Sequence, residues 1–361
     1  MTLLGPILPA LSMRWGLSDM QAGYLFFAQF ASSSLGMLLS GLLVRRYGYR
    51  RTLLLGLMLM ALGVGTLAQA DWHLGFIAVC IFGFAFGTNT PATNLFIARA
   101  NPEKSASALN LLNSSWGVGA MGCPLIIAVA QRANQVSVFF YSLAAGLVVL
   151  AISMTQVRFV ADEKVFIPGQ SQKQISNPWH HELLPIIALL FFVYVGSETS
   201  VGGWVASYAR RINSVSLFWT ITPAFYWGAL LIGRALAPLA LRRIHEIRMA
   251  AAGAALAAVG ISLFLMSHTM TLIVIGASLA GLGFASVYPI SVSLLANWFG
   301  ETATRVSGVI FSIGNLGGAV LPWLVGAISN QVGSLRIGLT VPLVGAVVMS
   351  LFYLANRSKQ L

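Results

Sequence analysis

Residues 183–208 read LLPIIALLFFVYVGSETSVGGWVASY, an apolar run long enough to cross a bilayer as one helix. Glu198 lies near the middle of this run, while the other eight acidic residues of the chain are expected in loops or at helix ends. An ionisable group at that depth costs roughly 3 kcal/mol or more, so it usually faces an internal cavity and has a function. The alternative is a protonated carboxyl that pins two helices together through a hydrogen bond.

The composition indicates an integral membrane protein made of helices. The 361 residues are 57% hydrophobic and only 8% charged, whereas a soluble domain carries about 25% charged residues. The apolar runs are too long for barrel strands, which read as short alternating segments. A net charge of +12 would suggest a nucleic-acid partner in a soluble protein. Here the basic residues fall in short loops and indicate topology instead, so no nucleic-acid partner is expected.

Twelve membrane spans are predicted from length and apolarity. They cover residues 1–13, 20–44, 52–70, 73–98, 106–130, 135–157, 183–208, 215–241, 248–267, 270–298, 305–330 and 336–356. The first span is shorter than the roughly 20 residues that the hydrocarbon core requires. We expect that half of this helix precedes Met1, and a stunted span is the alternative.

The loop charges predict the orientation. Fifteen of the 21 lysines and arginines lie in the loops after the even-numbered spans up to the tenth or in the C-terminal tail, and five lie on the opposite side. This bias places both termini in the cytoplasm of a multi-pass protein of the cell (inner or plasma) membrane. The polar loop 158–182 separates the predicted six-helix bundles 1–157 and 183–361, and we expect a monomer embedded in membrane lipid.

The two halves show an internal repeat. A shift of 198 residues superposes glycine, proline and a few other residues: Gly83, Phe86, Pro91, Ala98, Glu103, Ser114, Gly119 and Pro124 fall on Gly281, Phe284, Pro289, Ala296, Glu301, Ser312, Gly317 and Pro322. A shift of 192 pairs Gly36 with Gly228 and Gly41 with Gly233. Two similar six-helix halves are typical of an alternating-access transporter that binds its small-molecule substrate between them.

The loop after the second span carries a recognisable motif. Residues 41–50 read GLLVRRYGYR, which resembles the gating motif of the major facilitator superfamily: glycine, leucine, aspartate, arginine, glycine and a second basic residue. The resemblance implies a twelve-helix fold of two six-helix bundles. It assigns Gly41, Arg46, Gly48 and Arg50 to the cytoplasmic gate. Arg45 stands at the aspartate position of the motif, so the usual charge relay across that gate is not expected in its usual form.

Other stretches resemble the fucose/glucose:proton symporter branch of that superfamily. They are 4–11, 14–18, 29–30, 196–198, 202–204, 298–301, 305–308 and 314–318. The resemblance implies transport of a sugar or related polyol together with a proton. Characterised fucose symporters carry carboxylates in the first and fourth helices, but here the fourth-helix position aligns near Thr90 and the first helix has no acid. Glu198 is then the obvious proton carrier, with uniport or sodium coupling as alternatives.

Polar and aromatic side chains inside the spans are the candidates for substrate binding. A sugar site needs hydrogen-bonding groups for hydroxyls and an aromatic ring for stacking. The candidates are Gln29, Asn89, Asn94, Asn113, Trp116, Trp204, Trp227 and Asn315. Asn113 and Trp116 share a helical face because they are three residues apart. The alternative role is hydrogen bonding between helices for the amides and packing or interfacial anchoring for the tryptophans.

Arg234 is the lone basic residue inside a span. It is the predicted charge partner of Glu198, and the alternatives are an acidic substrate or a side chain that snorkels to the cytoplasmic interface. We hypothesise that Glu198 holds a proton while it faces outward, since desolvation disfavours the charged carboxylate. Substrate binding and rocking of the two halves would then expose Glu198 to the cytoplasm, where the proton leaves.

Two other functions fit the composition. One is a proton-coupled efflux antiporter of drugs or metabolites, and the other is a non-transporting membrane receptor. An enzyme is not expected, because the spans contain no Gly-x-Ser-x-Gly, no paired acids and no His/Cys dyad. The sequence also lacks a phosphate-binding loop with lysine and a metal-ligand cluster of cysteine and histidine. No cofactor or metal is therefore expected.

Overall fold

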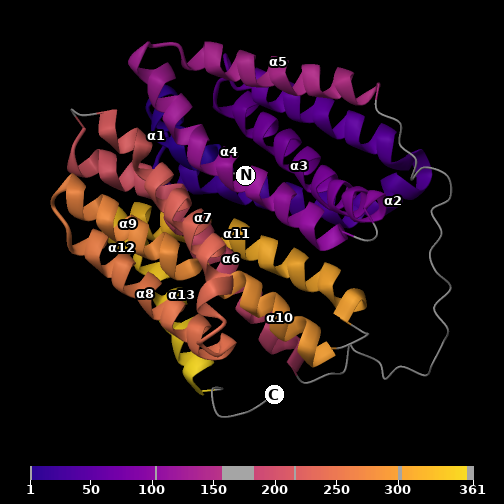
Figure 1. The fold of residues 1–361 in the computed structure, drawn as a ribbon. Helices are drawn as coiled ribbons and strands as arrows, with labels where there is room; N and C mark the ends of the chain where they lie inside the picture. The colour runs from indigo at the N-terminus through magenta and orange to yellow at the C-terminus, as the bar shows by residue number, and fades with distance from the viewer. Residues whose placement is uncertain (1, 102–103, 157–182, 215–216, 300–302, 356–361) are drawn as a thin grey trace. The chain divides into compact units, whose positions relative to one another are not determined.

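The structure is a computed structural model that describes residues 2–101, 104–156, 183–214, 217–299 and 303–355. The linker 158–182, the basic residues of the C-terminal tail and Glu301 therefore lie outside the described residues. The elements before the linker are α1 Leu4–Trp15, α2 Asp19–Thr66, α3 Trp72–Ala100, α4 Ser105–Arg132 and α5 Val136–Met154 (Figure 1). After it follow α6 Leu183–Ile212, the 3-10 helix η4 Leu217–Ile221, α7 Thr222–Ala240, α8 Glu246–Met266, α9 Met270–Phe284, α10 Val287–Phe299, α11 Ala303–Val332, α12 Leu335–Gly338 and α13 Thr340–Ala355.

These helices confirm the twelve predicted spans. Nine helical stretches in the described part of the chain are long and apolar enough to cross a membrane, and α1 and α7 form two further spans. The long helix α2 holds two predicted spans, while the pairs α9–α10 and α12–α13 each form one. The break between α9 and α10 lies shortly before Pro289, which has no N–H to donate to the carbonyl of Ala285.

Gly48 separates the two spans inside α2. Its φ of 79° and ψ of 168° lie outside the helical region, in a conformation that is essentially restricted to glycine. Tyr49, the next residue, packs into a small core with Val44, Leu53 and Ala92. The turn between the second and third spans therefore depends on the backbone freedom of Gly48, and the packed neighbours hold it in place.

Replacing Gly48 with alanine is expected to lower the free energy of unfolding by about 1–3 kcal/mol, because a Cβ atom strains this backbone conformation. Gly41→Ala is the matched control in the same motif, since an added Cβ there meets no atom within 4 Å. Thermal unfolding of the purified variants in detergent measures both. Equal melting temperatures for the two variants would contradict a conformational role for Gly48.

Contacts divide the described residues into two compact units. One contains residues 28–116 and 130–156, and the other contains 2–27, 117–129 and 183–355. The second unit includes α1, which packs closely against α6. A Cβ on Gly5 would lie only 2.6 Å from the carbonyl oxygen of Gly202 in α6. These units differ from the two sequence halves, 1–157 and 183–361. The division into two six-helix bundles stays a prediction.

Close glycine contacts within each unit reproduce the internal repeat. A Cβ on Gly83 would lie 2.3 Å from the carbonyl oxygen of Gln29 in the first unit. In the second unit, a Cβ on the counterpart Gly281 would lie 2.2 Å from the carbonyl oxygen of Tyr226. Small residues at such points let helix backbones approach closely in lipid. The shift of 198 residues thus matches equivalent helix contacts.

The contacts of Gly36 and Gly233 show that the pairing of glycines by a shift of 192 residues is wrong. A Cβ on Gly36 would meet the backbone of Phe84, whereas a Cβ on Gly233 would meet Leu282 and Ala285. Since residues 84 and 282 correspond under the 198 shift, Gly36 is equivalent to Gly233, not to Gly228. Two glycine pairs are too few to fix the alignment of one half of the sequence on the other. The contacts between helices fix that alignment.

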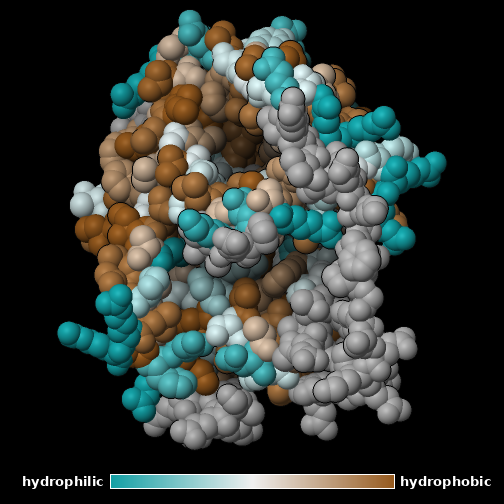
Figure 2. Space-filling view, turned by 45° about the vertical axis from the view of Figure 1, so that its right-hand side comes forward, coloured by the Kyte–Doolittle hydropathy of each residue, from teal (hydrophilic) through white to brown (hydrophobic). Residues whose placement is uncertain are grey.

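Large apolar side chains cover much of the outside of the helices. Leu35, Leu38 and Leu42 on α2 are all exposed and follow a helical spacing of three and four residues. Figure 2 shows hydrophobic residues over broad areas of the visible face, with hydrophilic residues gathered in other areas. An apolar exposed helix surface of this kind matches a lipid environment.

Candidate functional site

Glu198 in α6 forms an ion pair with Arg234 in α7. The Nη2 atom of Arg234 lies 3.0 Å from Oε1 of Glu198. The Glu198 side chain is 12% exposed and the Arg234 side chain 29%. Among the acidic residues that the structure describes, Glu198 is the one inside a helix, whereas Asp19, Asp71 and Glu246 cap or begin helices. The predicted charge pair is thus observed, partly buried between two neighbouring helices.

Two tyrosines that the sequence analysis missed complete the surroundings of Glu198. Tyr194 Oη donates a hydrogen bond to Glu198 Oε1 at 2.8 Å and lies 3.2 Å from the carbonyl oxygen of Phe284, the last residue of α9. Tyr226 Oη donates to the backbone carbonyl of Glu198 at 3.0 Å. The spacing of four residues between Tyr194 and Glu198 was a usable signal, because such residues meet on one helical face.

The close contact between α6 and α7 depends on Gly202. A Cβ at this position would lie 2.5 Å from Cζ2 of Trp227 and 3.0 Å from Cε1 of Tyr226. The rings of Tyr226 and Trp227 stack edge-on, with centroids 4.9 Å apart. Gly202 therefore makes room for the Tyr226 and Trp227 side chains of α7.

Trp204 has a packing role in this structure. Its Nε1 donates to the carbonyl oxygen of Pro322 in α11 at 2.9 Å, and its ring lies 5.8 Å from that of Phe26. Only 1% of the residue is exposed. Trp204 therefore ties α6 to α11. Trp227 is likewise buried, and so is Asn315 in α11.

The remaining substrate candidates belong to the first unit. Gln29 in α2 and Asn89 in α3 are buried, Asn94 and Trp116 are half-buried, and Asn113 is exposed. Asn89 Nδ2 donates to the carbonyl oxygen of Leu53 at 3.4 Å, and its amide fills the space beside Gly56. This is hydrogen bonding between α2 and α3, one of the two roles that the sequence left open. Each set of candidates is described within its own unit, and a shared substrate pocket stays a prediction.

The motif residues 41–50 form contacts within the first unit. Arg50 Nη2 donates to the carbonyl oxygen of Thr155, just after α5. The guanidinium of Arg46 lies 5.5 Å from the ring centroid of its neighbour Tyr47, and Arg99 of α3 lies 5.7 Å from that of Tyr49. Arg45 is exposed. The motif thus links the turn at Gly48 to α3 and α5, and its gating role stays a prediction.

Twelve apolar spans with a partly buried ion pair among them are the features of a secondary transporter. The chain belongs to the Major Facilitator Superfamily, whose family model matches residues 1–267. This confirms the predicted fold class and makes the protein a multi-pass membrane transporter of small molecules and not an enzyme.

Similar proteins extend over nearly the whole chain. The glucose/mannose transporter GlcP of Bacillus subtilis is 24% identical over 338 residues, which cover 91% of this chain and 84% of that protein. A glucose/galactose transporter of Brucella abortus is 27% identical over 349 residues, covering 91% and 83%. A crystal structure of a mutant nucleoside transporter NupG superposes with a TM-score of 0.79 at 12% identity, over 98% of this chain and 95% of that one. The last similarity shows the fold alone.

Proposed function

We propose that this protein is a proton-coupled symporter of a hexose or a related polyol, which works by alternating access. The observation that carries the substrate class is the similarity, over 91% of the chain, to transporters named for glucose, mannose and galactose. The resemblance of the sequence motifs to the fucose/glucose:proton symporter branch agrees with it. Loop charges favour a protein of the cell membrane with both termini in the cytoplasm.

The Glu198–Arg234 pair supports the proton coupling. When the carboxyl is ionised, it accepts a charge-assisted hydrogen bond from Arg234 and a second hydrogen bond from the neutral hydroxyl of Tyr194. Protonation removes the ion pair, so the contacts between α6 and α7 differ in the two protonation states. A proton can bias a conformational equilibrium only through such a difference in contacts. Glu198 is therefore proposed as the proton carrier and Arg234 as its charge partner.

The substrate is proposed to bind to amides and rings drawn from both sequence halves. Gln29 and Asn315 are buried amides on α2 and α11, and Asn113 and Trp116 lie on one face of α4. Hydroxyl groups of a sugar can exchange hydrogen bonds with such amides at little cost, since each amide both donates and accepts. We propose a monomer in lipid, in which Arg46, Gly48 and Arg50 control the cytoplasmic end.

Transport by purified protein in liposomes tests this proposal. With an inward proton gradient, radiolabelled glucose, mannose or galactose is expected to accumulate above its equilibrium level, and a sodium gradient is expected to have no effect. Accumulation driven by a sodium gradient would identify sodium, and not the proton, as the coupling ion. Equilibration of the sugar without accumulation would indicate uniport. Extrusion of apolar compounds instead of sugar uptake would indicate the efflux antiporter, and no flux of any solute would indicate a receptor.

A further inference from the structure

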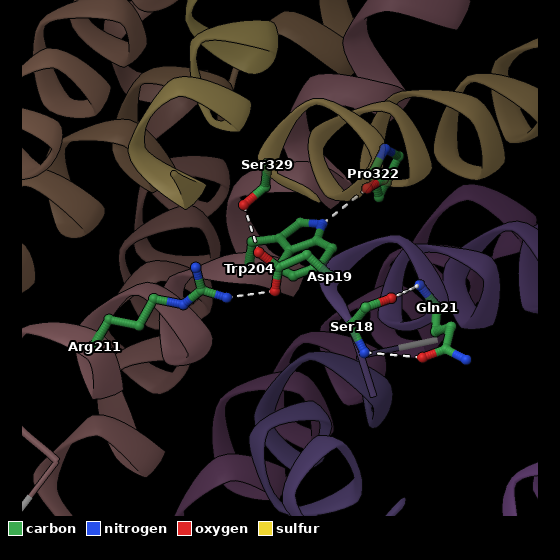
Figure 3. A network of polar contacts seen from close by, with 7 residues as sticks. All are labelled: Ser18, Asp19, Gln21, Trp204, Arg211, Pro322 and Ser329. Atoms are coloured by element: carbon green, nitrogen blue, oxygen red, sulfur yellow. Dashed lines mark hydrogen bonds and ion pairs between the residues drawn. The ribbon is translucent and has the colours of Figure 1, made fainter. Parts of the chain in front are cut away.

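A second charged network, at the start of α2, lies outside the site described above. The chain fixes its acidic residue locally: α1 ends with Gly16 in the left-handed conformation at a φ of 63°. Ser18 and Gln21 then begin α2 with reciprocal bonds, Gln21 N to Ser18 Oγ at 3.3 Å and Ser18 N to Gln21 Oε1 at 2.9 Å (Figure 3). This capping box places Asp19 in the first turn of α2, where a negative charge is favourable.

The Asp19 carboxylate joins three helices that are distant in sequence. One oxygen accepts from Nη2 of Arg211 in the last turn of α6, and the other accepts from the hydroxyl of Ser329 in α11. Figure 3 shows the carboxylate between these two donors. The Asp19 side chain is 16% exposed and the Arg211 side chain 45%. The contact is therefore reachable by water, and an ion pair of this kind is weak enough to be released.

Tight backbone packing lies next to this network. A Cβ on Gly326 would be 2.4 Å from the backbone oxygen of Asp19, and a Cβ on Gly23 would be 3.1 Å from Cα of Trp323. The contact between Gly5 and Gly202 is of the same kind. Helices that meet through glycines leave no passage for a solute. The end of the second unit that carries Asp19 is thus closed by α1, α2, α6 and α11.

A cavity of about 380 Å³ ends at this closure. Asp19, Trp204, Ser207, Arg210 and Arg211 line it. The loop-charge topology assigns Arg14, Arg210 and Arg211 to the side away from the cytoplasm. The cavity is therefore the vestibule on the outer side, and the solute would meet Asp19 and Arg211 before any residue deeper in the membrane.

From these contacts we infer that Asp19, Arg211 and Ser329 form a releasable outer latch. The latch holds the outer end closed while the cytoplasmic end is open, and its release admits the solute. When it opens, Asp19 keeps the favourable field of the α2 N-terminus and gains water, so release is readily reversible. The inference rests on the alternating access of the proposed function, but on neither the sugar nor the proton.

Labelling of a buried reporter cysteine tests the latch without substrate. Cys80 and Cys123 are replaced by alanine, and Ala22→Cys places a thiol at a buried position one turn beyond Asp19. In nanodiscs, Asp19→Asn and Arg211→Gln are each expected to raise the rate of maleimide labelling about fivefold to tenfold. The double variant is expected to match the single variants, because both remove the same contact. Ser329→Ala is expected to give a smaller increase.

Arg210→Gln is the matched control, because Arg210 lines the same cavity but its guanidinium lies over the Trp219 ring at 5.9 Å. Its labelling rate is expected to stay that of the parent. Equal labelling of the parent, Asp19→Asn and Arg211→Gln would overturn the latch, and so would an equal increase in Arg210→Gln. Should Asp19→Asn not fold, Arg211→Gln and Ser329→Ala decide. Failure of sugar uptake in liposomes would overturn the proposed function and leave this labelling result unchanged.

Discussion

Glu198→Gln is expected to lose the accumulation of sugar against its gradient and to retain exchange of sugar across the membrane. Glutamine has the shape of glutamate, and its Oε1 can still accept hydrogen bonds from Tyr194 and Arg234. Only the change of charge on proton binding is lost. The ratio of internal to external sugar should therefore fall to about one, the value for an uncoupled carrier.

Proteoliposomes measure both activities of this variant. Uptake is followed under an imposed proton gradient, and exchange is followed as counterflow from liposomes preloaded with the sugar. Glu246→Gln is the control, since Glu246 is the first residue of α8 and lies at a helix end, unlike Glu198. A Glu198→Gln protein that still concentrates sugar would leave Glu198 as a structural pin between helices, and coupling would have to be sought elsewhere.

Arg234→Met is expected to destabilise the protein more than the double variant Glu198→Gln/Arg234→Met. Removing the cation leaves an acidic group in a buried position without its partner, which costs about 3 kcal/mol in comparable buried pairs. The expected loss lies at or below that figure, because the Arg234 side chain is 29% exposed and the pair is only partly buried. The double variant removes both charges and should recover most of the loss.

Apparent melting temperatures in detergent for the parent, the two single variants and the double variant complete this cycle. Coupling between the two side chains appears as a double variant that is more stable than the sum of the single losses predicts. Strictly additive losses would show that the 3.0 Å contact contributes nothing specific, and the proposed dependence of the α6–α7 contact on protonation would then lack its basis.

Part of the candidate site could be predicted from sequence because it involves rare residues. Glu198 and Arg234 are the single acid and the single base inside the predicted spans, which indicates that they pair. The structure places the two side chains in contact. Trp204 shows the limit of the same reasoning. A tryptophan inside a span looks like a stacking surface, but its contacts with Pro322 and Phe26 come from α11 and α2, and no local pattern announces them.

The sequence by itself determined the twelve spans. Hydrocarbon thickness sets the length of a helix, and every backbone polar group must be satisfied within it, so apolar length alone identifies a span. The capping box at Ser18 is equally local, because its two partners are three residues apart. Such features depend only on residues a few positions apart.

Only the tertiary structure decided which helix faces met. Asp19 pairs with a residue 192 positions away and with another 310 positions away, whereas its sequence position indicates only an acid at a helix end. Tyr226 reached Glu198, and Gly36 proved equivalent to Gly233, for the same reason. The rotation of a helix about its axis and the identity of its neighbours depend on packing over the whole bundle, which a periodicity of 3.6 residues does not encode.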